Sequence, residues 1–308
     1  MERLDGGSAV PAHLAGGIVA LGNFDGFHLG HQAVVRRAVA RARGEGRPAL
    51  VATFDPHPVR YFRPDTPPFR LTTLDQRERL FAEAGADAMV VFAFDHAFAH
   101  LTAEAFVAER LVAALRVGGV VTGEDFTYGL KKGGSIATLR AAGERDGFSV
   151  DTVGAVMLDG APVSSTRIRE ALRDGDPRTA SRLLTRPFAI QGRVQHGDKL
   201  GRTIGYPTAN VDMGNYLRPA YGIYAVRARL ADGRQLTGAA NLGIRPTFDP
   251  PKELLEPYFF DFSGDLYDQV IEVSLIDYLR AEAKFDGLDA LVEQMDRDCA
   301  RARELLAE

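Results

Sequence analysis

A single cysteine stands among the 308 residues, which excludes an internal disulfide. Cys299 lies in an apolar helical stripe with Leu288, Leu291 and Met295, a pattern typical of packing residues rather than of a nucleophile. No run reaches the roughly 20 apolar residues of a membrane span. The first residues also lack the apolar stretch of a signal peptide. We therefore expect a cytoplasmic protein without a membrane partner.

The chain also has no excess of positive charge. It contains 37 lysines and arginines and 41 aspartates and glutamates, which gives a formal net charge of -4. Nucleic-acid backbones call for a basic surface, so we expect no nucleic-acid partner. A small phosphorylated ligand needs only a few local basic groups and backbone amides. At roughly 100–200 residues per domain, the length predicts two domains. No pattern in the sequence distinguishes a monomer from an assembly.

The first half alternates apolar, strand-like runs with helical patterns, five times over. The strand-like runs cover 17–23, 48–54, 88–94, 117–122 and 149–158, and the helical patterns 30–43, 73–84, 102–116, 135–144, 166–173 and 177–184. This alternation predicts an α/β fold, a doubly wound parallel sheet of Rossmann-like type. In such sheets ligands bind at the carboxyl ends of the strands.

The pattern changes near Arg186. Beyond it, short alternating runs are broken by Gly, Asp and Pro, which predicts a small antiparallel β-barrel. An amphipathic pattern over 288–306 predicts one helix that closes this half. We therefore expect a first domain over 1–184 and a second over 185–308.

The first expected strand runs directly into Gly-Asn-Phe-Asp-Gly-Phe-His-Leu-Gly-His. Gly22, Gly26 and Gly30 let the backbone approach a ligand closely. His28 and His31 share one face at the start of a helix, whose free N–H groups add positive potential. This arrangement suits the negative charge that develops when a nucleotide loses pyrophosphate. The alternative is that two histidines near a helix start are incidental.

A second polar cluster follows the fifth strand and opens another helix, in Val-Ser-Ser-Thr-Arg-Ile-Arg. Hydroxyls and arginines at a helix start form a phosphate cradle. Its members are Ser164, Ser165, Thr166, Arg167 and Arg169. The alternative is a helix cap with surface arginines, which explains one hydroxyl but not the whole cluster. We expect the two segments to meet across the sheet.

The second half carries a glycine-rich segment that ends in Pro-Thr-Ala-Asn. Thr208 and Asn210 are hard oxygen donors two residues apart, so along an extended segment they point the same way. With phosphate oxygens and water, such ligands suit Mg²⁺. The alternative is a polar barrel loop with turn glycines. The residues of the preceding loop are Gly197, Lys199, Gly201, Arg202, Thr203 and Gly205.

The first-half segments resemble the nucleotidylyltransferase signature and, more narrowly, the bacterial bifunctional riboflavin kinase/FMN adenylyltransferase (FAD synthetase) family. Thr-Phe-Asp-Pro-His-Pro over 53–58 and Gly-Glu-Asp-Phe-Thr-Tyr-Gly over 123–129 fit that family. The resemblance implies that His28 and His31 hold ATP phosphates and that Arg169 steadies the leaving pyrophosphate. It further implies nucleotide contacts from Gly22, Asn23, Asp25, Ser164, Ser165, Thr166 and Arg167, and flavin contacts from Asp55 and Asp125.

Pro-Thr-Ala-Asn after a glycine-rich loop resembles riboflavin kinases, and further segments at 221–226, 241–247, 265–267 and 279–285 follow in that family's order. The resemblance implies that Glu256 is the catalytic glutamate, because the unionised ribityl hydroxyl benefits from a general base. The alternative is a surface carboxylate at a strand start. It also implies Mg²⁺ on Thr208 and Asn210, a flavin contact from Arg245, and ATP contacts from Gly197, Lys199, Gly201, Thr203 and Thr208.

The leading hypothesis is a bifunctional enzyme with Mg²⁺ as cofactor and ATP as co-substrate. The barrel would convert riboflavin to FMN, and the first domain would convert FMN to FAD and pyrophosphate. In the second half, two residues depart from the riboflavin kinase pattern: Pro257 restricts the backbone of Glu256, and Asp268 replaces a usual glycine. A second hypothesis is therefore an enzyme with only one working half, in which the kinase is the weak one. A third is a flavin-binding regulator without catalysis, against which the intact polar residues argue.

Overall fold

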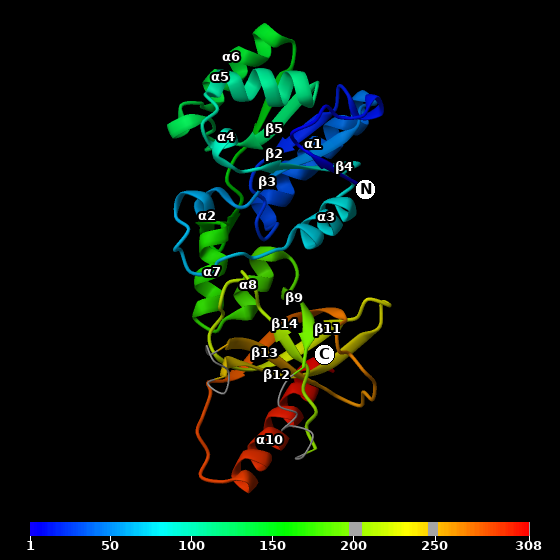
Figure 1. The fold of residues 1–308 in the computed structure, drawn as a ribbon, viewed down its shortest axis with the longest axis vertical. Helices are drawn as coiled ribbons and strands as arrows, with labels where there is room; N and C mark the ends of the chain where they lie inside the picture. The colour runs from blue at the N-terminus through cyan, green and yellow to red at the C-terminus, as the bar shows by residue number, and fades with distance from the viewer. Residues whose placement is uncertain (197–204, 246–251, 308) are drawn as a thin grey trace. The chain divides into compact units, whose positions relative to one another are not determined.

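The computed structural model describes residues 1–196, 205–245 and 252–307. The chain divides into two compact units (Figure 1). The first comprises Met1–Thr66 and Leu74–Ser164, and the second comprises Pro67–Thr73 and Ser165–Glu308. The domain ranges 1–184 and 185–308 stay predictions.

The first unit contains a six-stranded sheet in which every pair of neighbouring strands is parallel. The strand order is β1-β4-β3-β2-β5-β6. The strands are β1 (Glu2–Asp5), β2 (Ile18–Leu21), β3 (Ala49–Asp55), β4 (Ala88–Ala93), β5 (Gly119–Gly123) and β6 (Ser149–Val153). The predicted doubly wound parallel sheet is confirmed. The edge strand β1 was not predicted, because a strand of four mostly exposed residues is too short to show an apolar pattern.

Strand β2 is buried on both faces, as in sheets that helices cover on both sides. Ile18 and Ala20 belong to one hydrophobic core, and Val19 and Leu21 to the other. The helices of this unit are α1 (Leu29–Glu45), α2 (Pro58–Phe62), α3 (Leu74–Glu83), α4 (His96–Ala99), α5 (Ala103–Ala105), the π-helix η2 (Phe106–Ala114) and α6 (Ile136–Asp146), together with the short 3-10 helices η1 (Ala12–Leu14) and η3 (Leu130–Lys132). The helix expected over 102–116 is thus α5 followed by η2.

The chain order reverses at β2, which lies between β3 and β5. This reversal is the topological switch point at which open α/β sheets bind ligands. The carboxyl end of β2 leads directly into the loop 22–28 and then into α1. The fold therefore places the first predicted site where such folds carry their sites.

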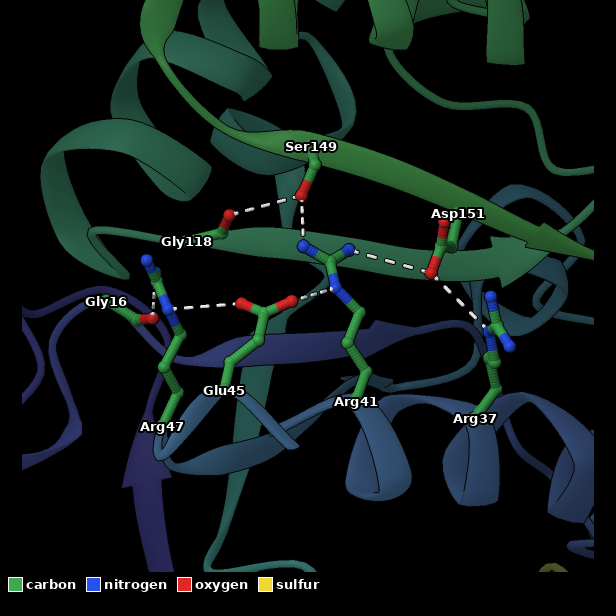
Figure 2. A network of polar contacts seen from close by, with 8 residues as sticks. All are labelled: Gly16, Arg37, Arg41, Glu45, Arg47, Gly118, Ser149 and Asp151. Atoms are coloured by element: carbon green, nitrogen blue, oxygen red, sulfur yellow. Dashed lines mark hydrogen bonds and ion pairs between the residues drawn. The ribbon is translucent and has the colours of Figure 1, made fainter. Parts of the chain in front are cut away.

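The other end of α1 is fastened to the amino ends of β5 and β6 (Figure 2). Arg41 donates a hydrogen bond to Ser149 Oγ and pairs with Glu45 at 2.6 Å and with Asp151 at 3.6 Å. Arg47 Nη1 donates to the Gly16 carbonyl at 2.9 Å. This network anchors the helix whose first turn carries the two histidines.

The second unit is built on a closed antiparallel barrel in the order β10-β13-β12-β11-β14-β9. Its strands are β9 (Phe188–Gln195), β10 (Asn210–Asp212), β11 (Gly222–Arg229), β12 (Gln235–Arg245), β13 (Lys252–Phe259) and β14 (Val270–Arg280). Its helices include α7 (Ser165–Arg173), α8 (Pro177–Leu184) and α10 (Leu288–Leu306). The predicted barrel with a terminal helix is confirmed.

Helix α10 packs on the barrel through its carboxyl half. Ala302 and Leu306 share a buried cluster with Ala225 of β11 and Ala239 of β12. In the part of the chain that the structure describes, no helix is both long enough and apolar enough to cross a membrane.

Candidate functional site

The loop between β2 and α1 has an unusual backbone that two buried rings hold in place. Phe24, Gly26 and Phe27 have positive φ angles of 51°, 88° and 44°. Such angles are uncommon for phenylalanine and persist only where packing over-determines them. Both Phe24 and Phe27 pack edge-on against Phe81, with ring centroids 5.7 and 5.0 Å away. The loop is therefore held in one shape beside the start of α1.

The two histidines of this loop lie against each other. Their rings are stacked, with centroids 3.6 Å apart and an interplanar angle of 18°. His28 is the N-cap of α1, and its Nδ1 accepts a hydrogen bond from the backbone N–H of His31 at 3.3 Å. Because Nδ1 accepts, this hydrogen bond assigns the proton of a neutral His28 ring to Nε2. Nε2 of a neutral His28 ring is therefore a hydrogen-bond donor, the role that an anionic oxygen requires.

Gly30 leaves room for this stack and brings the loop beside the second cluster. A Cβ atom at Gly30 would lie 3.2 Å from the His28 ring and 3.7 Å from the carbonyl oxygen of Val163. The segment that ends the first unit at Ser164 therefore runs past the histidine loop. The expected meeting of the two segments is found at Val163, within the first unit.

Asn23 is exposed, whereas Asp25 is only 4% exposed. The Asn23 carbonyl accepts hydrogen bonds from Thr53 Oγ1 at 2.8 Å and from Arg77 Nη1 at 3.2 Å. Arg77 also forms an ion pair with Asp55 at 3.8 Å. Sequence reasoning missed Arg77. The signal that could have found it is its place on the apolar stripe of α3, beside Leu80 and Phe81, where an arginine is out of pattern.

The remaining residues of the predicted phosphate cradle lie in the first turns of α7, in the second unit. Arg169 Nε donates to the Phe69 carbonyl at 2.9 Å, and its guanidinium lies 5.2 Å from the centroid of the Phe69 ring. Ser165 and Arg167 are half-buried, whereas Thr166 is exposed. These contacts hold the Arg169 guanidinium in a defined orientation.

The second unit contains a cavity of about 630 Å³ between the barrel and α10. One wall is polar and includes Thr208, Asn241 and Glu256. The other wall, which we call the apolar wall, is formed by Phe285 and by Leu288, Leu291, Met295 and Cys299 of α10. The other lining residues are Tyr206, Ile223, Ala239, Ala240, Tyr258, Arg280, Glu282, Ala283, Gly287 and Asp298. The cavity thus offers an apolar surface and a polar surface to one ligand.

The stripe residues Leu288, Leu291, Met295 and Cys299, which the sequence assigns to packing, line this cavity. This part of α10 lies over the cavity, and Cys299 also packs against the cluster that Ala302 and Leu306 share with the barrel, as predicted. Burial raises the pKa of the Cys299 thiol to about 11, and the negative charges of the nearby Asp298 and Asp296 contribute to this increase. The thiol is therefore protonated at neutral pH, which disfavours a nucleophilic role.

The strand register explains why the polar residues meet. Glu256 of β13 lies opposite Asn241 of β12, and Thr208 forms a bridge with Tyr258 of β13. Residues opposite each other in antiparallel strands share a face. Asn210 starts β10 and stands opposite Gln195 of β9, and the next residue, Val211, stands opposite Leu255 of β13. Of the two predicted metal ligands, Thr208 lines the cavity with Glu256, whereas Asn210 is not among the described residues that line it.

Two contacts join α10 to the rim of the cavity. The Tyr206 hydroxyl donates to Asp296, and burial, together with this carboxylate, raises the pKa of Tyr206. Arg280 binds Asp298 through Nε at 3.0 Å and Nη2 at 2.7 Å. These contacts hold the apolar wall over the polar one.

The two departures from the family pattern leave Glu256 in the cavity. Pro257 lies inside β13, where the extended conformation that it imposes on Glu256 is the one a strand requires. Asp268 has a φ of 62°, a conformation that favours glycine and that aspartate tolerates better than most residues.

The other residues predicted for the two sites are described only in part. Gly197, Lys199, Gly201 and Thr203 fall outside the described residues, as does the side chain of Arg245 at the end of β12. Asp125 is exposed just after β5, with Oδ1 3.0 Å from the position of a Cβ atom on Gly123. Gly22 follows β2 directly.

Comparison with known proteins gives matches over both halves. Residues 10–167 match the FAD synthetase family, and residues 184–306 match the riboflavin kinase family. The bifunctional riboflavin kinase/FMN adenylyltransferase of Haemophilus influenzae is 41% identical over 94% of both chains. That of Escherichia coli K12 is 40% identical over 94% of this chain and 92% of its own. A crystal structure described as a macrolide-efflux protein from Streptococcus pneumoniae is similar with a TM-score of 0.87 and 32% identity, covering 98% of this chain and 99% of its own.

Proposed function

This chain belongs to the bifunctional riboflavin kinase/FMN adenylyltransferase family, and we propose how its own residues perform the two reactions. It phosphorylates riboflavin to FMN and adenylylates FMN to FAD. The first half matches the FAD synthetase family and the second half the riboflavin kinase family, so each reaction has its own site.

In adenylyl transfer, the phosphate of FMN attacks the α-phosphorus of ATP, and pyrophosphate leaves. The attacking phosphate is already ionised, so the site must supply positioning and charge stabilisation rather than a strong base. The observation that carries the assignment is the stacked pair of His28 and His31 at the N-terminus of α1. His28 donates from Nε2 to a phosphate oxygen, and the α1 dipole adds to the stabilisation. Gly22, Asn23 and Asp25 contact the nucleotide.

Val163 lies beside Gly30, which stands between the two histidines in the chain. The polar residues that follow Val163 in the chain bind the other phosphate oxygens. Ser164, Ser165, Thr166 and Arg167 bind phosphate oxygens, and Arg169 stabilises the leaving pyrophosphate. The Phe69 carbonyl and ring support this role because they hold the Arg169 guanidinium in a defined orientation. On the flavin side, Asp55 and Asp125 contact FMN.

In the kinase reaction, Glu256 accepts the proton of the ribityl hydroxyl, whose oxygen attacks the γ-phosphorus of ATP, and ADP leaves. Glu256 stands on the polar wall of the cavity, opposite the apolar wall of α10. A flat, largely apolar ring system with a polar side chain fits such a pair of walls. Arg245 contacts the flavin, and Gly197, Lys199, Gly201, Thr203 and Thr208 contact ATP.

The side-chain oxygen atoms of Thr208 and Asn210 fit Mg²⁺, which prefers hard oxygen ligands. Thr208 and Asn210 would hold the ion, and it would neutralise charge on the ATP phosphates. Asn241 supports the fit, because its buried Oδ1 accepts no hydrogen bond from any residue that the structure describes. Small-molecule substrates, a reducing cytoplasmic location and the absence of a nucleic-acid partner complete the proposal.

Replacement of His28 and His31 together by alanine tests the first assignment. Purified wild type and His28→Ala/His31→Ala protein receive riboflavin, ATP and Mg²⁺, and chromatography separates the flavins. We expect the double variant to accumulate FMN and to form no FAD. Unchanged FAD formation would show that the histidine pair is not the adenylylation site.

A further inference from the structure

Arg77 of α3 carries a buried charge that neither reaction scheme uses. Its side chain is 4% exposed. Taking a guanidinium out of water is unfavourable unless hydrogen bonds and an opposite charge compensate. The position of Arg77 therefore depends on its partners, and these partners belong to the proposed adenylylation site.

The guanidinium reaches two segments that are far apart in the chain. Its Nη1 donates to the Asn23 carbonyl at 3.2 Å and to Thr53 Oγ1 at 2.9 Å. Thr53 Oγ1 in turn donates to the same carbonyl at 2.8 Å. Its Nη2 lies 3.8 Å from Asp55 Oδ1. One cation therefore contacts both the loop after β2 and the carboxyl end of β3.

The Asn23 carbonyl, which accepts the hydrogen bond from Arg77, lies just before the strained part of the loop 22–28. It belongs to the peptide that joins Asn23 to Phe24, the first residue with a positive φ. A peptide beside a strained residue keeps its orientation only if its surroundings fix it. Two donors on one oxygen supply that constraint. Rotation of this peptide would redirect the backbone that leads to His28.

We propose that Arg77 is a positioning residue for adenylyl transfer. It holds the nucleotide loop and Asp55 at a fixed separation, so that the FMN phosphate and the α-phosphorus of ATP meet in line. The inference rests on the proposed assignment of the loop 22–31 to ATP and of Asp55 to the flavin. Misplacement of reacting groups by about 1 Å lowers a rate by as much as about 100-fold.

The test compares Arg77→Met and Arg77→Lys with Arg79→Met as the matched control. Arg79 lies on the same helix and pairs with Glu83 at 3.6 Å, at the surface. Initial rates of FMN-to-FAD and riboflavin-to-FMN conversion are measured on the same preparations, at a temperature well below unfolding. We expect Arg77→Met to lower kcat for FAD formation about 10- to 100-fold, with kinase activity within about twofold of wild type. Arg77→Lys should fall between, because an ammonium keeps the charge but loses the planar fork.

A second variant separates positioning from a loss of fold. Thr53→Val removes one of the two donors on the Asn23 carbonyl and keeps the side-chain shape, so kcat for FAD formation should fall about 3- to 10-fold. Thr53→Val added to Arg77→Met should lower kcat little further, because both residues act on one carbonyl. Unchanged kcat in Arg77→Met, equal losses in both reactions, or simple multiplication of the two effects would overturn the proposal. If instead the assignment of the loop 22–31 to ATP is wrong, the His28→Ala/His31→Ala protein will still form FAD. This result distinguishes failure of that assignment from failure of the role proposed for Arg77.

Discussion

Glu256 on β13 stands directly opposite Asn241 on β12, and both side chains line the same cavity. Cross-strand partners in an antiparallel sheet share a face, so the register itself places the carboxylate beside the amide. A shift of one residue would turn Glu256 away from the cavity. The barrel therefore holds the proposed base in place through backbone pairing.

Glu256→Gln should abolish riboflavin phosphorylation. Glutamine has nearly the same shape but cannot accept the proton of the ribityl hydroxyl, so the rate should fall by about 100-fold or more. FMN-to-FAD conversion by the same preparation should remain within about twofold of wild type. Equal loss of both activities would indicate misfolding, and retention of kinase activity would remove Glu256 from the mechanism.

Cys299 should report on occupancy of the cavity. Because its pKa is raised to about 11, the thiolate fraction and the rate of alkylation should rise about tenfold per pH unit from pH 7 to 10. An unperturbed thiol would level off near pH 9. Riboflavin should slow alkylation, and mass spectrometry of iodoacetamide-treated protein measures both effects. Rapid labelling at pH 7, or no protection by riboflavin, would contradict this account of the cavity.

Asp268→Gly and Asp268→Ala should change stability in opposite directions. At a φ of 62°, glycine has no steric penalty, whereas alanine has one and lacks aspartate's tolerance of this conformation. We expect the glycine variant to be the more stable of the two by about 1 kcal/mol in urea unfolding. Equal unfolding free energies would show that this backbone conformation carries no strain.

Gly118→Ala should destabilise the first unit. A Cβ atom there would lie 1.8 Å from Arg47 Nη1 and 2.4 Å from the Gly16 carbonyl oxygen, within the network of Figure 2. Overpacking of this kind costs about 1–3 kcal/mol. Gly44→Ala is the control, since nothing lies within 4 Å of its Cβ position on α1, and it should stabilise by about 0.5–1 kcal/mol. Similar melting temperatures for both variants would contradict the contacts around Gly118.

The sequence predicts the fold well where a pattern repeats. Apolar strands that alternate with helices indicate the parallel sheet, and short runs between Gly and Pro indicate the barrel. Residues grouped in one short segment, such as the pair His28 and His31, could be recognised because neighbours in the chain stay neighbours in space. The sequence alone does not show that Asp268 adopts a φ of 62°, a conformation that favours glycine.

What the sequence does not show depends on contacts between distant segments. Arg77 is 54 residues from Asn23, and its helical pattern gives no indication of which carbonyl it meets. The stripe of α10 predicts an apolar face correctly, but not that a cavity lies beneath part of it. Such features depend on how helices and strands pack together, which a local sequence pattern does not show.

A time course with the wild-type protein, riboflavin, ATP and Mg²⁺ tests the central claim most directly. Two separate sites predict that FMN appears first and that FAD follows after a lag, at the expense of FMN. Glu256→Gln protein in the same assay should leave riboflavin unchanged yet convert added FMN to FAD. Riboflavin that persists with wild type, or added FMN that is never converted, would contradict a chain with two working sites.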